Sequence, residues 1–244
     1  MINVLICGIS GKMGATVEEL LRGDKNAKAV CGVDVRNNES KIPVYDSFEK
    51  VKEKVDVIID FSSPTVLKSE LEWAAKNGVP VVLGSTGFSD KDLQLIENSA
   101  KSIAIFKTAN FSLGVNLLMK LVRQSAEILG EKFDVEIIER HHSQKVDAPS
   151  GTALMLAESA NATGKPYIYG REGATKRGNE IGIHAVRGGT IVGEHEVMFA
   201  GEDEIITLSH SAHSKKVFAA GAIKAAIFIA GKPSGKYDMQ DIIK

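Results

Sequence analysis

The fold is decided by the stretch Ile2-Asn3-Val4-Leu5-Ile6-Cys7-Gly8-Ile9-Ser10-Gly11-Lys12-Met13-Gly14. Its first six residues form a mostly apolar run, which is typical of a parallel strand buried on both faces. The glycines follow in a G-x-x-G-x-x-G pattern at the start of a predicted helix over 13–21. Gly8 permits a tight turn, Gly11 lets backbone N–H groups approach a pyrophosphate, and Gly14 allows close helix–strand packing. The stretch therefore predicts a dinucleotide-binding βα unit.

A carboxylate lies where this kind of fold binds a ribose. A second predicted strand over 27–33 is followed by Asp34, roughly 20 residues after the glycines. The motif is not the strict G-x-G-x-x-G, so a related fold that holds another ligand stays an alternative. Asp34 favours the free 2′-hydroxyl of NAD, whereas Arg36 and Lys12 are cations that could pair with the 2′-phosphate of NADP. The choice between NADH and NADPH is therefore open, and dual use is our hypothesis.

Strands and helices alternate through the first part of the chain. Further strands are predicted over 55–61, 79–83 and 103–106, and further helices over 67–76 and 90–101. This alternation predicts an α/β fold with a doubly wound, mostly parallel Rossmann-type sheet. Ligands lie outside the carboxyl ends of the strands in such sheets, which makes the loops 84–87 and 108–111 candidate cofactor loops. The plain alternative is that Gly84 and Gly87 only terminate a strand.

The pattern changes after residue 111. A long amphipathic helix is predicted over 115–129, and the strands that follow, over 134–139, 181–187, 190–199 and 204–210, have little helix between them. Consecutive strands imply a mixed or antiparallel sheet, hence a second domain of α+β type. We expect one domain over 1–111 and 215–244 and another over 112–214. Within them we predict a mobile loop or lid over 161–180, a helix over 216–230 and a short element over 238–243.

The candidate chemistry lies in His141-His142-Ser143-Gln144-Lys145-Val146-Asp147-Ala148-Pro149-Ser150-Gly151-Thr152. His141, His142 and Lys145 can carry protons where a predicted strand gives way to a loop. Ser150 is a candidate N-cap of the next helix, whose first N–H groups, at 151 and 152, would attract a carboxylate or phosphate. A solvated surface loop is the plain alternative. We predict no metal site, because adjacent histidines in a strand point to opposite faces and no cysteine lies nearby.

Composition narrows the class of protein. The 244 residues include 30 basic and 31 acidic side chains with a formal net charge of −1, so no overall field recruits nucleic acid or an anionic membrane. No apolar run approaches the roughly 20 residues of a membrane span. The first residues lack the basic region of a signal peptide. Cys7 and Cys31 lie in predicted strands, so we expect both to be small residues of the core. Such cysteines are typical of a protein in a reducing compartment. We expect a cytoplasmic protein.

These motifs resemble those of the 4-hydroxy-tetrahydrodipicolinate reductase (dihydrodipicolinate reductase) family of bacterial lysine and diaminopimelate synthesis. The likeness covers essentially the whole chain. It rests on 8–14, 84–88, 109–116, 192–195, 235–239 and above all 139–152. The resemblance implies reduction of 4-hydroxy-tetrahydrodipicolinate to tetrahydrodipicolinate with NADH and/or NADPH. It also implies a small cyclic dicarboxylate substrate and a homotetramer formed through the sheet of the second, substrate-binding domain.

The resemblance further implies roles for single residues. His141 would be the proton donor, Lys145 a second acid or cation, and His142 a substrate ligand. Ser150, Gly151 and Thr152 would hold a substrate carboxylate. The nicotinamide cofactor would be held by Gly8, Ile9, Ser10, Gly11, Lys12, Met13, Asp34, Gly84, Ser85, Thr86, Thr108, Ala109, Asn110 and Phe111. The chain departs from the family at Val35, where many members carry an arginine that binds the 2′-phosphate of NADP.

Two other functions remain as alternatives. A semialdehyde-type dehydrogenase would need a cysteine nucleophile at the domain junction, whereas both cysteines lie in predicted strands of the first domain. A non-catalytic, dinucleotide-sensing regulator on the same fold would bind the cofactor without turnover.

Overall fold

The computed structural model describes residues 1–36 and 40–243 and divides into two units. The first unit contains Met1–Ser112 and the segment from Lys216 onward, so the chain leaves this unit and later returns to it. The second unit is Leu113–Lys215. Among the described residues, none of the helices has the length and apolar character needed to cross a lipid bilayer.

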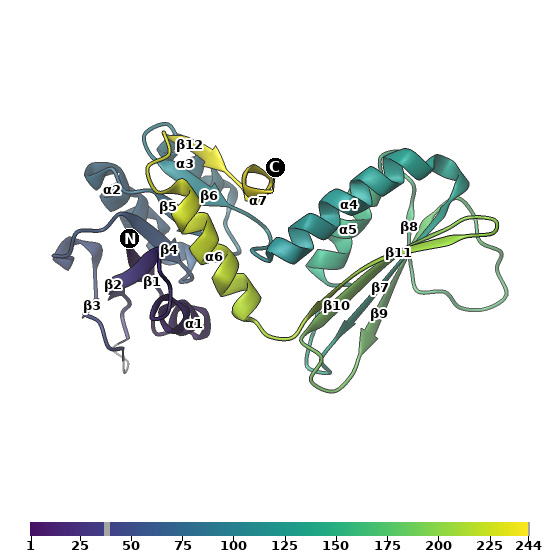
Figure 1. The fold of residues 1–244 in the computed structure, drawn as a ribbon, viewed down its shortest axis with the longest axis horizontal. Coiled ribbons are helices and arrows are strands. Elements are labelled where there is room, and N and C mark those ends of the chain that lie inside the picture. The colour runs from purple at the N-terminus through teal and green to yellow at the C-terminus, as the bar shows by residue number, and fades with distance from the viewer. Residues whose placement is uncertain (37–39, 244) are drawn as a thin grey trace. The chain divides into compact units, whose positions relative to one another are not determined.

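A seven-stranded sheet forms the centre of the first unit (Figure 1). The strands, in chain order, are β1 Ile2–Cys7, β2 Ala27–Val33, β3 Val44–Tyr45, β4 Val57–Asp60, β5 Val81–Leu83, β6 Ala104–Lys107 and β12 Gly235–Tyr237. Their order in the sheet is β12-β6-β5-β4-β1-β2-β3, and every neighbouring pair is parallel. The order reverses between β1 and β4. In an open α/β sheet this switch point is where ligands bind, outside the carboxyl ends of the strands.

Helices cover both faces of this sheet. Apolar side chains of α1 (Lys12–Leu21) and α6 (Lys216–Ile229) pack on one face, and those of α2 (Leu67–Asn77) and α3 (Asp90–Ser99) pack on the other. Successive residues of β1 alternate between these two cores, with Ile6 in the first and Cys7 in the second. The unit is completed by η1 Phe48–Lys50, η2 Pro64–Val66 and α7 Met239–Ile242. The predicted doubly wound fold is confirmed.

Local signals explain where these helices begin and end. α2 follows the short helix η2, which starts at Pro64. The C-cap of α2 is Gly78, which adopts a left-handed conformation with φ +66°. α3 begins with a capping box in which the Ser89 hydroxyl accepts from the N–H of Asp92 and the Asp92 side chain accepts from the N–H of Ser89. The strands β3 and β12 were not predicted. Each is only two or three residues long and exists through its pairing with β2 or β6.

The second unit contains a five-stranded mixed sheet. Its strands are β7 Asp134–His141, β8 Tyr167–Tyr169, β9 Ile181–Arg187, β10 Gly193–Ala200 and β11 Ile205–Ala212, in the order β11-β10-β7-β9-β8. β10 is antiparallel to β7 and β11, while β9 is parallel to β7 and β8. The predicted α+β class with a mixed sheet is confirmed. The prediction of a loop over 161–180 missed β8, which lies within it.

The helices of this unit pack on one face of the sheet. Apolar residues of α4 (Leu113–Leu129) and α5 (Gly151–Ala160) form a core with the inward side chains of β7, such as Val135 and Ile137. The short helix η3, Gly130–Lys132, follows α4. The alternate residues Glu136, Ile138 and Arg140 point to the opposite face and are half-exposed. Within 113–215, all of which the structure describes, no helix packs on that opposite face.

Candidate functional site

The glycine-rich turn after β1 has a geometry that only glycine allows. Gly8 has φ +77°, and a Cβ at this residue would lie 2.8 Å from the backbone of Phe61. A Cβ at Gly14 would lie 2.2 Å from the carbonyl oxygen of Gly8, so the absence of a side chain lets the first turn of α1 approach the strand end. The turn leaves the N-terminus of α1 beside the switch point of the sheet, where a phosphate would be stabilised.

Asp34 connects this turn to the end of β2. Its Oδ2 accepts from the backbone N–H of Ser10 at 3.0 Å, and its Oδ1 accepts from the N–H of Arg36 at 2.9 Å. The Ser10 hydroxyl in turn donates to the carbonyl oxygen of Arg36 at 2.7 Å. Nε of Arg36 lies 3.8 Å from Oδ1 of Asp34, and the Arg36 side chain is 75% exposed. A carboxylate and an exposed cation therefore lie side by side where a ribose would be recognised.

A cavity of about 250 Å³ opens at the carboxyl ends of β1, β2 and β4. Gly8, Gly11 and Asp34 are the predicted cofactor residues that line it. The full lining is Cys7, Gly8, Gly11, Val33, Asp34, Val35, Arg36, Asp46, Phe61, Ser62, Ser63, Thr65 and Val66. Sequence reasoning missed the residues after β4, although their position at a strand carboxyl end was a signal that could have included them.

The remaining predicted residues of the turn have mixed environments. Ile9 is fully buried in the core with α1 and α6, so only its backbone is available to a cofactor. Met13 is half-buried against the same core. Lys12 begins α1 and carries a candidate cation for a phosphate at that helix end.

The loops after β5 and β6 lie beyond this cavity. Gly84 donates its N–H to the carbonyl oxygen of Asp60 at 2.7 Å, while Thr86 and Ala109 are exposed. Thr108 Oγ1 donates to the carbonyl oxygen of Asn110 at 3.1 Å, which closes a tight turn. Phe111 is a core residue, because its ring packs against Phe61 at 5.8 Å and Phe106 at 6.1 Å, centroid to centroid. Its backbone is therefore the part that a ligand could contact.

In the second unit, a fully buried carboxylate organises the predicted acid–base residues. Glu139 of β7 accepts from Nδ1 of His141 at 2.6 Å, from Nη1 and Nη2 of Arg187 at 2.7 and 2.8 Å, and from the backbone N–H of Ser150 at 2.9 Å. Burial by itself would raise the pKa of Glu139, but the hydrogen bonds from Arg187, His141 and Ser150 outweigh it and lower that pKa. Glu139 is therefore ionised at neutral pH.

His141 is the last residue of β7 and presents its other nitrogen away from Glu139. A Cβ at Gly193 would lie 3.0 Å from Nε2 of His141, so this glycine keeps the nitrogen clear. The ring of His195 packs edge-to-face against the ring of His141, with 5.1 Å between the ring centroids and an interplanar angle of 73°. Burial, and then the charge of His141, lower the pKa of His195 to about 4, so His195 is neutral at neutral pH.

The helix start that follows is built as predicted. Ser150 is the N-cap of α5, and its hydroxyl accepts from the N–H of Ala153 at 3.2 Å. The same hydroxyl lies 3.0 Å from Nε2 of His195. The Ser150 side chain is therefore buried, and its hydroxyl already has two partners within the protein. Gly151 is exposed and Thr152 is half-exposed at the positive end of the helix.

Lys145 and His142 belong to the loop before this helix. Nζ of Lys145 lies 2.9 Å from Oδ1 of Asp147, and the Lys145 side chain is 20% exposed. His142 is half-exposed, and its carbonyl oxygen accepts from the N–H of Lys145 at 3.1 Å. The loop is also tied to Arg187, whose Nη2 donates to the carbonyl oxygen of Asp147 at 2.7 Å. His141, Lys145 and the α5 N-terminus thus belong to one short segment anchored on Glu139.

Comparison with known proteins is consistent with this geometry. The family model described as "Dihydrodipicolinate reductase, N-terminus" matches residues 2–111, and the one described as "Dihydrodipicolinate reductase, C-terminus" matches residues 114–243. The chain is 48% identical to the 4-hydroxy-tetrahydrodipicolinate reductase of Caldanaerobacter subterraneus subsp. tengcongensis, over all of this chain and 99% of that protein. It is 46% identical to the enzyme of the same name from Clostridium tetani, over 98% and 96% of the two chains.

A solved structure agrees with these sequence matches. Dihydrodipicolinate reductase from Paenisporosarcina sp. TG-14, determined with dipicolinate bound, superposes with a TM-score of 0.83. The two chains are 28% identical, and the match covers all of both.

Proposed function

The chain belongs to the dihydrodipicolinate reductase family, and we propose that it reduces 4-hydroxy-tetrahydrodipicolinate to tetrahydrodipicolinate with NADH or NADPH, in the synthesis of lysine and diaminopimelate. The observation that carries the mechanism is the Glu139–His141 pair beside the N-terminus of α5. A hydrogen-bonded carboxylate fixes a histidine as an acid, and a positive helix end beside it suits a substrate with two carboxylates.

The residues of the first unit fit a nicotinamide dinucleotide. The Gly8–Gly11 turn and the start of α1 would hold the pyrophosphate, and Asp34 would accept from a ribose hydroxyl in the cavity beside it. The loops at 84–86 and 108–111 would border the nicotinamide half. When bound, the cofactor supplies a hydride from C4 of its nicotinamide ring.

The second unit would bind the cyclic dicarboxylate. The N–H groups of Gly151 and Thr152 would hold one carboxylate at the start of α5, with Lys145 and His142 as the cationic and hydrogen-bonding side chains around it. The relative from Paenisporosarcina was solved with dipicolinate, a planar ring that carries two carboxylates. The same donors would position the substrate ring against His141.

The proton is the part of the reaction that this chain supplies. In the overall reaction the substrate would first lose its 4-hydroxyl, together with one proton from the neighbouring ring carbon, as water, which leaves a conjugated C=C–C=N system. One hydride and one proton would then enter the ring. The hydride would add to one end of the C=C bond, and the adjacent ring atom would take a proton from Nε2 of His141. The buried Glu139 carboxylate stabilises the imidazolium before this transfer and keeps the ring oriented.

A homotetramer would form through the open face of the second sheet. The face that carries Glu136, Ile138 and Arg140 is half-exposed and is not packed by a helix of residues 113–215, all of which the structure describes. Such a face is a candidate for pairing with a second copy of the chain.

We also place the enzyme in the cytoplasm, because its pathway makes amino acids and both cysteines are free thiols.

A coupled assay tests the function. The oxidation of NADH and NADPH is followed with the freshly formed condensation product of aspartate semialdehyde and pyruvate, beside aspartate semialdehyde alone. We expect turnover only with the condensation product. Turnover with aspartate semialdehyde alone would indicate a semialdehyde dehydrogenase, and cofactor binding without turnover would indicate a dinucleotide sensor.

Two variants test the assignment of the proton donor. His141→Gln keeps a polar side chain but cannot protonate the ring, so kcat should fall by roughly a hundredfold or more while KM changes little. Lys145→Ala should lower kcat and raise KM, because it removes a charge that helps to hold the substrate. His213→Gln removes an exposed histidine outside the candidate site and serves as the matched control. An unchanged kcat in His141→Gln would remove this residue from the acid role.

A further inference from the structure

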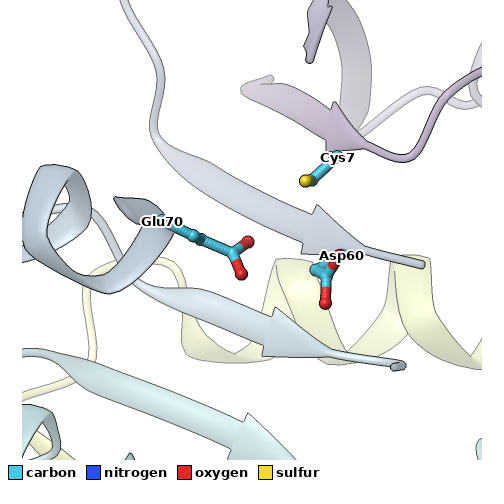
Figure 2. Close-up of side chains that lie close together, drawn as sticks. All are labelled: Cys7, Asp60 and Glu70. Atoms are coloured by element: carbon cyan, nitrogen blue, oxygen red, sulfur yellow. The ribbon is translucent and has the colours of Figure 1, made fainter. Parts of the chain in front are cut away.

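Three acidic groups lie together beneath the cofactor cavity. Cys7 ends β1, Asp60 ends β4 and Glu70 lies on α2, and all three are buried (Figure 2). One ligand atom from each lies within 4.8 Å of those of the other two. In Figure 2 the Glu70 carboxylate points toward Asp60 and Cys7. Cys7 also lines the cavity, so the cluster is directly below it.

The three groups cannot all be charged. Burial raises the pKa of Glu70 and of the Cys7 thiol well above their ordinary values, and the nearby acidic groups raise both further. Both carboxyl oxygens of Glu70 are buried and make no hydrogen bond within the described part of the chain. Two carboxyls buried this close together do not both ionise. Glu70 is therefore the neutral carboxyl, and the single negative charge of the cluster belongs to Asp60.

Asp60 has the donors that a charged carboxylate requires. It accepts from the backbone N–H of Ser62 at 2.8 Å and from the hydroxyls of Ser62 and Ser85. Burial raises its pKa, and these same hydrogen bonds oppose that rise. Ser62 belongs to the segment that lines the cavity, and Ser85 belongs to the loop after β5. One buried side chain thus joins two loops at the carboxyl edge of the sheet.

We propose that Asp60 is a positioning residue for the dinucleotide, which holds the loops of Ser62 and Ser85 at the spacing that the cofactor needs. The inference rests on the proposed function, because it takes these loops to be part of the cofactor site. Asp60 acts through the two serines: it is buried behind them and is itself absent from the cavity lining. Its backbone carbonyl adds to the link by accepting from the N–H of Gly84.

The test is NADH binding, measured by fluorescence of the reduced nicotinamide on the full-length protein. Asp60→Asn exchanges the charge for an amide and weakens both serine contacts, so we expect the Kd for NADH to rise roughly tenfold. Ser85→Ala removes one of the two serine hydroxyls that donate to Asp60, with little change in volume, and should raise the Kd for NADH by roughly threefold to tenfold. Glu70→Gln keeps the shape of a carboxyl that is already neutral and should leave the Kd within about twofold.

A kinetic readout separates positioning from general damage to the fold. In Asp60→Asn and Ser85→Ala, KM for NADH should rise while KM for the dicarboxylate stays the same, because the substrate residues belong to the other unit. If Asp60→Asn does not fold, Ser85→Ala decides the question. Wild-type affinity for NADH in Ser85→Ala, or in a folded Asp60→Asn, would overturn the proposal.

Two further results would also count against the proposed role of Asp60. Tight binding of Zn²⁺ to the wild type, lost in Glu70→Gln, would show that Glu70 is ionised and that the cluster is a cation site. Failure of the wild type to bind either NADH or NADPH would remove the proposed function and this inference together. Because that result concerns the wild type and the others concern variants, the two failures are distinguishable.

Discussion

Nδ1 of His141 lies 2.6 Å from Oε2 of Glu139, and this contact determines which nitrogen of the imidazole can act on a substrate. Glu139 is fully buried and ionised, so it accepts the N–H of Nδ1 and leaves Nε2 as the nitrogen that can transfer a proton. Arg187 holds the same carboxylate with both terminal nitrogens and also binds the carbonyl oxygen of Asp147. The orientation of His141 and the position of its loop therefore depend on one glutamate.

Replacing Glu139 with glutamine should damage catalysis more than binding. The amide keeps the volume but cannot stabilise an imidazolium, so we expect kcat to fall by roughly tenfold to a hundredfold, with KM for NADH unchanged. Loss of the buried partner of Arg187 should also lower the free energy of unfolding by about 3 kcal/mol. Steady-state kinetics and urea denaturation measure the two effects. Glu158→Gln, on an exposed position of α5, is the control, and a kcat within twofold of wild type would contradict the role of Glu139.

Gly193→Ala tests whether Nε2 of His141 must be kept clear. The added methyl would lie 3.0 Å from this nitrogen, so it should obstruct the proton transfer and lower kcat/KM for the dicarboxylate by roughly tenfold. The melting temperature should change little, because the three atoms nearest to the added methyl belong to one side chain and none of them is a backbone atom. Gly188→Ala adds the same methyl where no atom lies within 4 Å and should be neutral. Equal activity of the two variants would show that the approach to Nε2 is not needed.

The main elements could be predicted because their signals are local. The mostly apolar runs of β1, β2 and β9 are each followed by a polar or glycine residue, and the structure has all three strands with the predicted limits. The strands β3, β8 and β12 were missed for the opposite reason. Each has two or three residues and forms only because a longer neighbouring strand offers backbone partners, which depends on residues far away in sequence.

The residues that surround His141 show the same limit of prediction from sequence. Glu139 could have been anticipated, because it lies two residues before His141 and therefore on the same face of the strand. Arg187 and His195 could not. Arg187 pairs with His141 through the parallel register of β7 and β9, and His195 pairs with Glu139 through the antiparallel register of β7 and β10. Strand register is a tertiary property that no local motif in the chain encodes.

His195 should make the protein sensitive to mild acid. Its pKa is lowered to about 4 in the fold, chiefly by burial, against about 6.5 in an unfolded chain. A histidine kept neutral contributes stability that is fully present above the unfolded pKa and is lost as pH falls from about 6.5 toward 4. The loss should reach about 2–3 kcal/mol.

Two measurements check this pH dependence. An NMR titration of the His195 ring should give a pKa of about 4. Urea denaturation at pH 7 and pH 5 should show a smaller difference in His195→Gln than in wild type, whereas His213→Gln, which removes an exposed histidine, should match wild type. A His195 pKa near the ordinary value of about 6.5 would refute the prediction.

Arg36 should set how well the enzyme accepts NADPH. Asp34 repels a 2′-phosphate, but Nε of Arg36 lies only 3.8 Å from its Oδ1, and the exposed guanidinium can turn to pair with that phosphate. We therefore expect the wild type to use both cofactors, with kcat/KM values that differ by less than roughly a hundredfold. Arg36→Ala should raise KM for NADPH by roughly tenfold and leave KM for NADH within about twofold.

The comparison needs a control for the loss of surface charge. Lys25→Ala removes an exposed cation away from the cavity lining and should affect neither KM. The Arg36 effect should also shrink as ionic strength rises, because an exposed ion pair is screened by salt. Equal rises in both KM values for Arg36→Ala would mean that the Arg36 side chain stabilises the loop after β2 through its contact with Asp34 and does not bind the 2′-phosphate.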